Sequence, residues 1–88
     1  MTENKLENLR KEIDKIDSEI IQLLAKRFKV VKQIGVFKKE NKITVVDKER
    51  FQKVLEKVAN IAEKQGISRD FTNDIYKIIH EYSCELEM

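Results

Sequence analysis

Apolar residues recur at a spacing of seven along the first 37 residues of the chain. One series contains Leu6, Ile13, Ile20 and Ile34, and the second, offset by three, contains Leu9, Ile16, Leu23, Val30 and Phe37. This spacing predicts one long helix, from about residue 4 to residue 40, with a continuous apolar stripe. Such a helix is about 52 Å long, whereas a compact chain of 88 residues has a radius of gyration of only about 12 Å. We therefore expect a second copy of the chain to bury part of the stripe.

Two shorter helices follow, and capping residues mark their ends. Asp47 is a favourable N-cap for a helix over residues 48–65, and Gly66 is a favourable stop. Ser68 is a similar cap for a helix over residues 69–87. Between the first two helices, residues 43–46 form a short run typical of extended chain. With no proline and only two glycines, the sequence predicts an all-α fold of three helices in a single domain over residues 1–88.

The composition argues against several classes of protein. Lys and Arg (18) nearly balance Asp and Glu (16), and no basic stripe is present, which disfavours nucleic-acid binding. We see no signal peptide and no run near the ~18 apolar residues of a membrane span. The single cysteine, Cys84, fits a reducing compartment and a role as a small apolar filler. His80 has no partners at metal-ligand spacing. We expect a cytoplasmic protein without a metal site.

Arg27 interrupts the apolar stripe of the long helix at a position where Leu or Ile would be expected. A buried guanidinium needs an anion, which is either an acidic side chain of the same protein or a carboxylate or phosphate of a ligand. Lys38 follows eleven residues later, on the same helix face and about 16 Å along the axis. The two cations are spaced to hold a small dianion between them, although Lys38 as a solvated residue near a helix end is an equally good interpretation.

Other polar residues give weaker signals. Arg10 flanks the stripe about 25 Å from Arg27, so the two share a small ligand only across an antiparallel dimer. The third helix has a polar edge that is also explained as a solvated face, made of Tyr76, His80, Ser83 and Glu87. At the start of the second helix, capping by Asp47 and a surface position for Arg50 are sufficient explanations.

Four segments together resemble the AroQ-type, all-α chorismate mutases. They are LRKEIDKIDSEIIQLLAKR at residues 9–27, GVFK at 35–38, VVDKER at 45–50 and IIHEYSCELE at 78–87. The resemblance covers nearly the whole chain. It implies an intertwined homodimer of three-helix chains with paired long helices, and two equivalent sites that each take one arginine from the partner.

The resemblance also implies roles for individual residues. Arg10 matches the arginine that crosses the interface, and Arg27 and Lys38 match the arginine and lysine of the site itself. Asp47, Arg50 and Ser83 match further residues that contact the substrate. The resulting substrate-binding set is Arg10, Arg27, Lys38, Asp47, Arg50, Phe51, Ser83 and Glu87, with Arg27, Lys38 and Glu87 expected to be catalytic.

Two positions depart from the common family pattern. Phe51 stands where many members have a glutamate that contacts the ring hydroxyl of the substrate, so Ser83 and Asp47 would have to supply that contact. Glu87 stands where many bacterial members have glutamine, and as an ionised carboxylate it would repel negative charge developing on the substrate. A protonated Glu87 would instead donate a hydrogen bond, so we expect activity to fall as the pH rises.

The implied reaction is the pericyclic rearrangement of chorismate to prephenate, in phenylalanine and tyrosine biosynthesis, which needs no nucleophile, metal or cofactor. Two relatives on the same scaffold are alternatives, namely isochorismate-pyruvate lyase and aminodeoxychorismate mutase. A non-catalytic regulatory or dimerisation module is an alternative of another class, and a helical nucleic-acid binder is the weakest.

Overall fold

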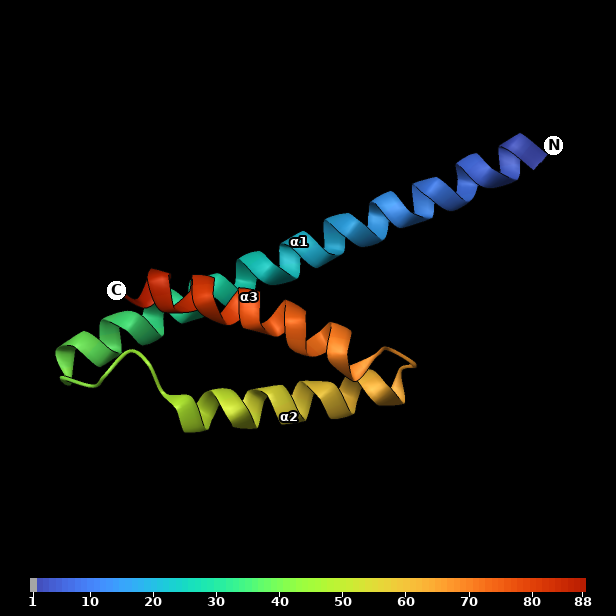
Figure 1. The fold of residues 1–88 in the computed structure, drawn as a ribbon. Helices are drawn as coiled ribbons and strands as arrows, with labels where there is room; N and C mark the ends of the chain where they lie inside the picture. Colours follow the sequence, from blue (N-terminus) through green and yellow to red (C-terminus); the bar gives the residue numbers. More distant parts are fainter. Residues whose placement is uncertain (1) are drawn as a thin grey trace. The chain divides into compact units, whose positions relative to one another are not determined.

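The computed structural model describes the chain from residue 2, and its side chains from residue 4, to residue 88. Three helices make up this part of the protein: α1 (Thr2–Glu40), α2 (Lys48–Lys64) and α3 (Arg69–Glu87), with no strand among the described residues (Figure 1). The all-α fold class expected from the sequence is therefore confirmed. The long helix begins two residues earlier than its periodicity indicated, and α2 ends one residue earlier.

The chain divides into two compact units, Met1–Val30 and Val31–Met88. In the first unit, α1 exposes the apolar stripe along its length: Leu6, Leu9, Ile13, Ile16, Ile20 and Leu23 are each 48–62% accessible to solvent. A helix of this kind derives most of its stability from packing of its apolar face rather than from helix propensity alone. The stripe is consequently an unburied surface in a single copy of the chain.

In the second unit, α2 and α3 form a hairpin and pack against each other (Figure 1). Most buried residues of this pair are small, namely Ala59 and Ala62 on α2 and Thr72 and Ser83 on α3, whereas Glu87 at the end of α3 is a buried carboxylate. Small side chains at a helix–helix contact allow the two backbones to approach closely. Larger apolar residues on both helices, including Ile61 (53%) and Phe71 (57%), remain exposed.

Local chemistry sets the ends of α2 and α3 as the sequence indicated. The Asp47 carboxylate accepts a hydrogen bond of 3.0 Å from the backbone N–H of Arg50, and the Ser68 hydroxyl accepts one of 3.2 Å from Phe71. Each cap satisfies a backbone donor that has no partner within its helix. Gly66 has a φ of 76°, a conformation that favours glycine and that ends α2.

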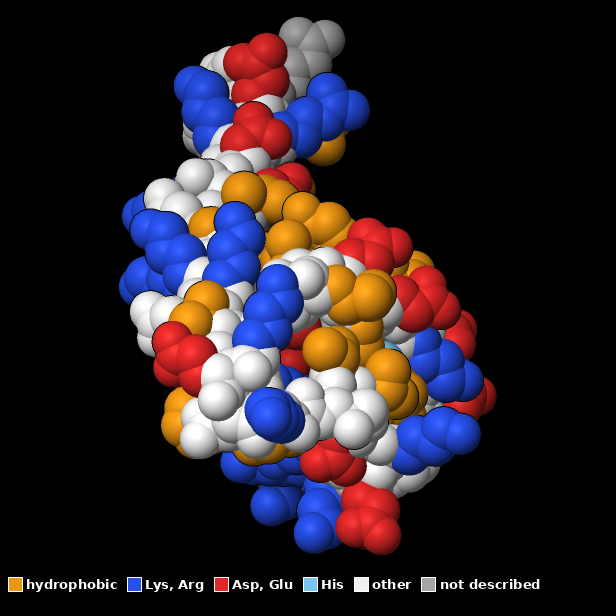
Figure 2. Space-filling view, turned by 90° about the vertical axis from the view of Figure 1, so that its left-hand side faces the viewer, with side chains coloured by type: hydrophobic (Ala, Val, Ile, Leu, Met, Phe, Trp, Pro, Cys, Tyr) orange, Lys and Arg blue, Asp and Glu red, His pale blue; other side chains and the backbone are white. Residues whose placement is uncertain are grey.

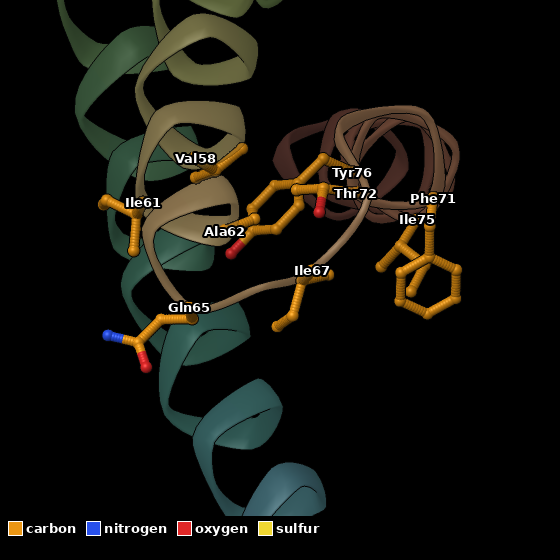
Figure 3. A pocket seen from close by; sticks show the side chains of 9 residues that line it. All are labelled: Val58, Ile61, Ala62, Gln65, Ile67, Phe71, Thr72, Ile75 and Tyr76. Carbon is orange, nitrogen blue, oxygen red and sulfur yellow. The ribbon is translucent and has the colours of Figure 1, made fainter.

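A groove of about 270 Å³ lies between α2 and α3 near the turn that joins them (Figure 3). Its lining is mainly apolar and consists of Val58, Ile61, Ala62, Gln65, Ile67, Phe71, Thr72, Ile75 and Tyr76. On the face of the molecule drawn in Figure 2, exposed apolar side chains lie between basic and acidic ones. Within the described residues, no helix combines the length and the apolar character needed to cross a bilayer.

Candidate active site

Lys38 is fixed at two contacts near the end of α1. Its Nζ donates a hydrogen bond of 2.8 Å to the carbonyl oxygen of Val45, in the loop between α1 and α2. The same Nζ lies 2.7 Å from Oε1 of Glu87, at the end of α3. The two side chains are only 17% and 10% exposed, so this ion pair is largely removed from water. Two fixed contacts hold the ammonium group at one place and leave a third donor direction available.

Glu87 is a buried carboxylate in the last turn of α3, with 9% of the residue exposed. Apart from the ion pair with Lys38, its buried Oε1 has no hydrogen-bond partner within the described chain. A carboxylate in this position is expensive to bury unless a cation compensates it. Lys38 supplies that compensation. The oxygen also keeps capacity to accept a further hydrogen bond, or to carry a proton itself.

Gly35 lies one turn before Lys38 and is buried beneath the end of α3. A Cβ atom added at this position would lie 2.8 Å from Cα and 2.9 Å from the carbonyl oxygen of Glu87. The backbones of α1 and α3 therefore meet here without a side chain between them. From the sequence, Gly35 was recognised only as a weak helix former within the long helix. Nothing in the sequence indicated that Gly35 allows close packing of α1 and α3.

Phe51 on α2 and His80 on α3 form an aromatic contact next to the site. Their rings stack with centroids 3.8 Å apart and planes inclined by 10°. On the following turn of α3, Sγ of Cys84 lies 3.5 Å from Nε2 of His80. His80, Cys84 and Glu87 follow one face of α3, at spacings of four and three residues. Phe51 and His80 were each identified in the sequence, but nothing in the sequence indicated that their two rings would stack.

The thiol of Cys84 keeps its proton near neutral pH. Burial raises the pKa of Cys84, and the neighbouring Glu87 carboxylate raises it further, while the Lys38 ammonium lowers it. The contact between Sγ of Cys84 and Nε2 of His80 is 3.5 Å long, and the tautomer of His80 decides which atom donates. This pair is therefore unlike an activated cysteine–histidine dyad, which requires a thiolate.

Three further predicted site residues also belong to the second unit. Ser83 is buried, and its hydroxyl donates a hydrogen bond of 2.7 Å to the carbonyl oxygen of Ile79, one turn earlier in α3. Asp47 is engaged as the N-cap of α2, and Arg50 is exposed in the first turn of that helix. Contact of these residues with a substrate stays a prediction.

Arg10 and Arg27 belong to the first unit, on α1. Arg10 is exposed, whereas Arg27 is partly buried. Seventeen helical residues separate them, which corresponds to about 25 Å along the axis, so one protomer cannot bring both to the same small ligand. Binding of one dianion by Arg27 and Lys38 stays a prediction. A contact between Arg10 and that ligand also stays a prediction.

The three helices and the buried lysine–glutamate pair define an all-α protein with a charged site where helix ends meet. No cluster of three or more His, Cys, Asp or Glu side chains suited to a metal occurs among the described residues. The chain belongs to the chorismate mutase type II family, whose model matches residues 9–88. The family resemblance recognised in the sequence is thereby confirmed.

Individual proteins that are similar to this chain are named for different activities. The chain is 37% identical over 82 residues to a bifunctional chorismate mutase/prephenate dehydratase of Buchnera aphidicola, a match covering 93% of this chain and 21% of that protein. It is 26% identical to a chorismate mutase of Methanocaldococcus jannaschii, covering 94% and 84% of the two chains. It is also 33% identical to an isochorismate pyruvate lyase of Pseudomonas aeruginosa, covering 91% and 79%. The chain thus spans about a fifth of the length of the bifunctional relative.

Proposed function

We propose that this protein is a chorismate mutase, an isomerase that converts chorismate to prephenate in the cytoplasm, with residues 1–88 acting as one domain. The observation that carries the proposal is the buried, doubly anchored ammonium group of Lys38. Family membership and a relative named chorismate mutase that this chain largely spans support the same reaction.

Catalysis of this rearrangement has two requirements, namely orientation of the substrate and stabilisation of the charge that develops on it. The flexible dianion must be held in a compact geometry in which the reacting carbon atoms are close, which lowers the entropic part of the barrier. Negative charge that develops on the ether oxygen as its C–O bond breaks must also be stabilised by donors that are already in place. Neither requirement involves a nucleophile or a cofactor, because all bonds form and break within the substrate.

The residues divide between these two tasks. Arg27 and the Arg10 of a partner chain bind the carboxylates, for which the planar guanidinium group is well suited. Lys38 donates to the ether oxygen from the position that Val45 and Glu87 fix. Glu87 assists on the same oxygen when protonated. Contacts to the remainder of the substrate are supplied by Asp47, Arg50, Phe51 and Ser83.

A homodimer is part of this proposal, because Arg10 and Arg27 of one chain lie too far apart to share a substrate. The exposed stripe of α1 and the apolar groove between α2 and α3 are surfaces that a second copy would bury (Figure 3). Exposed apolar surface of this extent in a small soluble protein is typical of a protein–protein interface.

The direct experiment measures the loss of chorismate absorbance with purified protein and identifies the product. Formation of prephenate supports the proposal, whereas a folded protein without turnover would favour the non-catalytic module.

The shared site has its own test, in which inactive Arg10→Ala and Arg27→Ala variants are unfolded together and refolded. Half of the resulting dimers are mixed and each has one intact site, so activity should return to about a quarter of the wild-type value. Activity that stays at the level of the single variants would exclude a site shared between chains.

Isochorismate-pyruvate lyase activity is the second candidate. It is favoured by Phe51, whose ring stacks on His80 and places an apolar group on this part of α2, and by the relative that carries that name. Incubation with isochorismate alone separates the two, because the lyase releases pyruvate and salicylate.

A further inference from the structure

Gly35 lies so close to the backbone of Glu87 that a side chain at this position would be blocked, whereas a side chain at Gly66, the other glycine, would meet no atom within 4 Å. An added Cβ at Gly35 would lie 2.8 Å from Cα, 2.9 Å from the carbonyl oxygen and 3.2 Å from the carbonyl carbon of Glu87. Non-bonded carbon atoms pack at about 3.5–4.0 Å. All three neighbours are backbone atoms, so rotation of a side chain cannot relieve the overlap, and the last turn of α3 would have to move.

This contact is coupled to the candidate site by the geometry of α1. Gly35 and Lys38 are three residues apart, so they lie on one face of the helix. The backbone of Glu87 rests on Gly35, and its carboxylate reaches Nζ of Lys38 at 2.7 Å. The packing distance between the last turn of α3 and Gly35 therefore sets the distance between the Glu87 carboxylate and the Lys38 ammonium group.

We propose that Gly35 is a positioning residue, whose missing side chain allows the last turn of α3 to place the Glu87 carboxylate against the Lys38 ammonium group. The effect on turnover rests on the proposed function, whereas the positioning itself is measured independently of any substrate.

Cys84 provides that independent measurement, because it is the only cysteine of the chain and lies near the contact. The titratable groups around its thiol are Glu87, Lys38 and His80. Burial and the Glu87 carboxylate both raise the pKa of Cys84. If the last turn of α3 is lifted away from α1, the burial of the thiol, which is the largest of these influences, weakens and the pKa of Cys84 falls, although the smaller influence of Lys38 weakens as well. The rate of alkylation by iodoacetamide, measured against pH, reports this change.

The test compares Gly35→Ala with Val36→Ala, a change that alters no charge at the neighbouring, exposed position of the same helix. Gly35→Ala should keep its helix content, because the α2–α3 hairpin does not depend on Gly35, and should lower the pKa of Cys84. Val36→Ala should leave that pKa at the wild-type value. Turnover of chorismate should fall by about 10²-fold in Gly35→Ala, mainly in kcat, as expected for a catalytic group displaced by about 1 Å.

A second comparison separates positioning from a general structural effect. In a Glu87→Gln background, Gly35→Ala should change the pKa of Cys84 by a different amount than in the wild-type background, because the displaced group no longer carries a charge that pairs with Lys38. A wild-type thiol titration in Gly35→Ala would overturn the proposal, and so would loss of the helical fold. If the wild-type protein fails to convert chorismate, the proposed function is wrong. The titration of the Cys84 thiol then still tests the positioning role of Gly35.

Discussion

Replacing Lys38 with methionine tests how much the protein depends on its buried ion pair. The variant keeps a side chain of similar length but removes the ammonium group. Two acceptors then lose their donor, namely the carbonyl oxygen of Val45 and Oε1 of Glu87, which has no other hydrogen-bond partner among the described residues. The structure therefore predicts a loss of stability in addition to any loss of activity.

The size of this loss follows from the burial of the pair. Breaking a fully buried ion pair by removing one partner costs about 3–5 kcal/mol. The two side chains of this pair keep 17% and 10% of their surface exposed, so the pair is not fully buried. We therefore expect a decrease of about 2 kcal/mol in the free energy of unfolding, within the range for an unsatisfied buried polar group.

Urea unfolding at a fixed protein concentration provides the assay, because formation of the proposed homodimer would make the apparent stability depend on concentration. The control is the double variant Lys38→Met/Glu87→Gln, in which no buried charge is left unpaired, and it should recover part of the lost stability. The cost of Lys38→Met should also shrink as the pH is lowered, since a protonated carboxyl is cheaper to bury than a carboxylate. A Lys38→Met variant as stable as the wild type, with the same pH dependence, would refute this account.

Four further outcomes are expected. Lys38→Ala should retain its helical circular dichroism but lose about 10²–10³-fold in kcat, as for removal of a preorganised donor. Glu87→Gln should change kcat for chorismate while the helical circular dichroism is retained, because it replaces the carboxylate that contacts Lys38 by an uncharged amide; a kcat equal to that of the wild type would exclude the role given to Glu87. Alkylation of Cys84 should require a higher pH than alkylation of a free thiol, with its pKa lowered by Glu87→Gln and raised by Lys38→Met. Phe51→Ala should cost at least about 0.5–1.5 kcal/mol of unfolding free energy for the lost ring stack with His80; Phe51→Leu, which keeps apolar contact, should lose less.

The helices of this protein could be predicted from sequence because their signals are local. A spacing of seven residues specifies a helix with one apolar stripe wherever it occurs, and the caps at Asp47 and Ser68 act within a single turn. The same locality explains the small errors at helix ends, where one residue more or less changes the free energy little. The exposed stripe of α1 was also anticipated, since its length alone exceeds what one small chain can cover.

The candidate site was only partly accessible to the same reasoning. Lys38 and Glu87 could be named through the family resemblance, but their ion pair joins the ends of two helices that are far apart in sequence. Its distance depends on a close backbone contact at Gly35, and the stack of Phe51 on His80 depends on how α2 packs on α3. Periodicity describes one helix at a time and contains no information on how closely two helices pack. The sequence by itself thus determined the helices and their chemical content, while packing between helices decided which side chains meet.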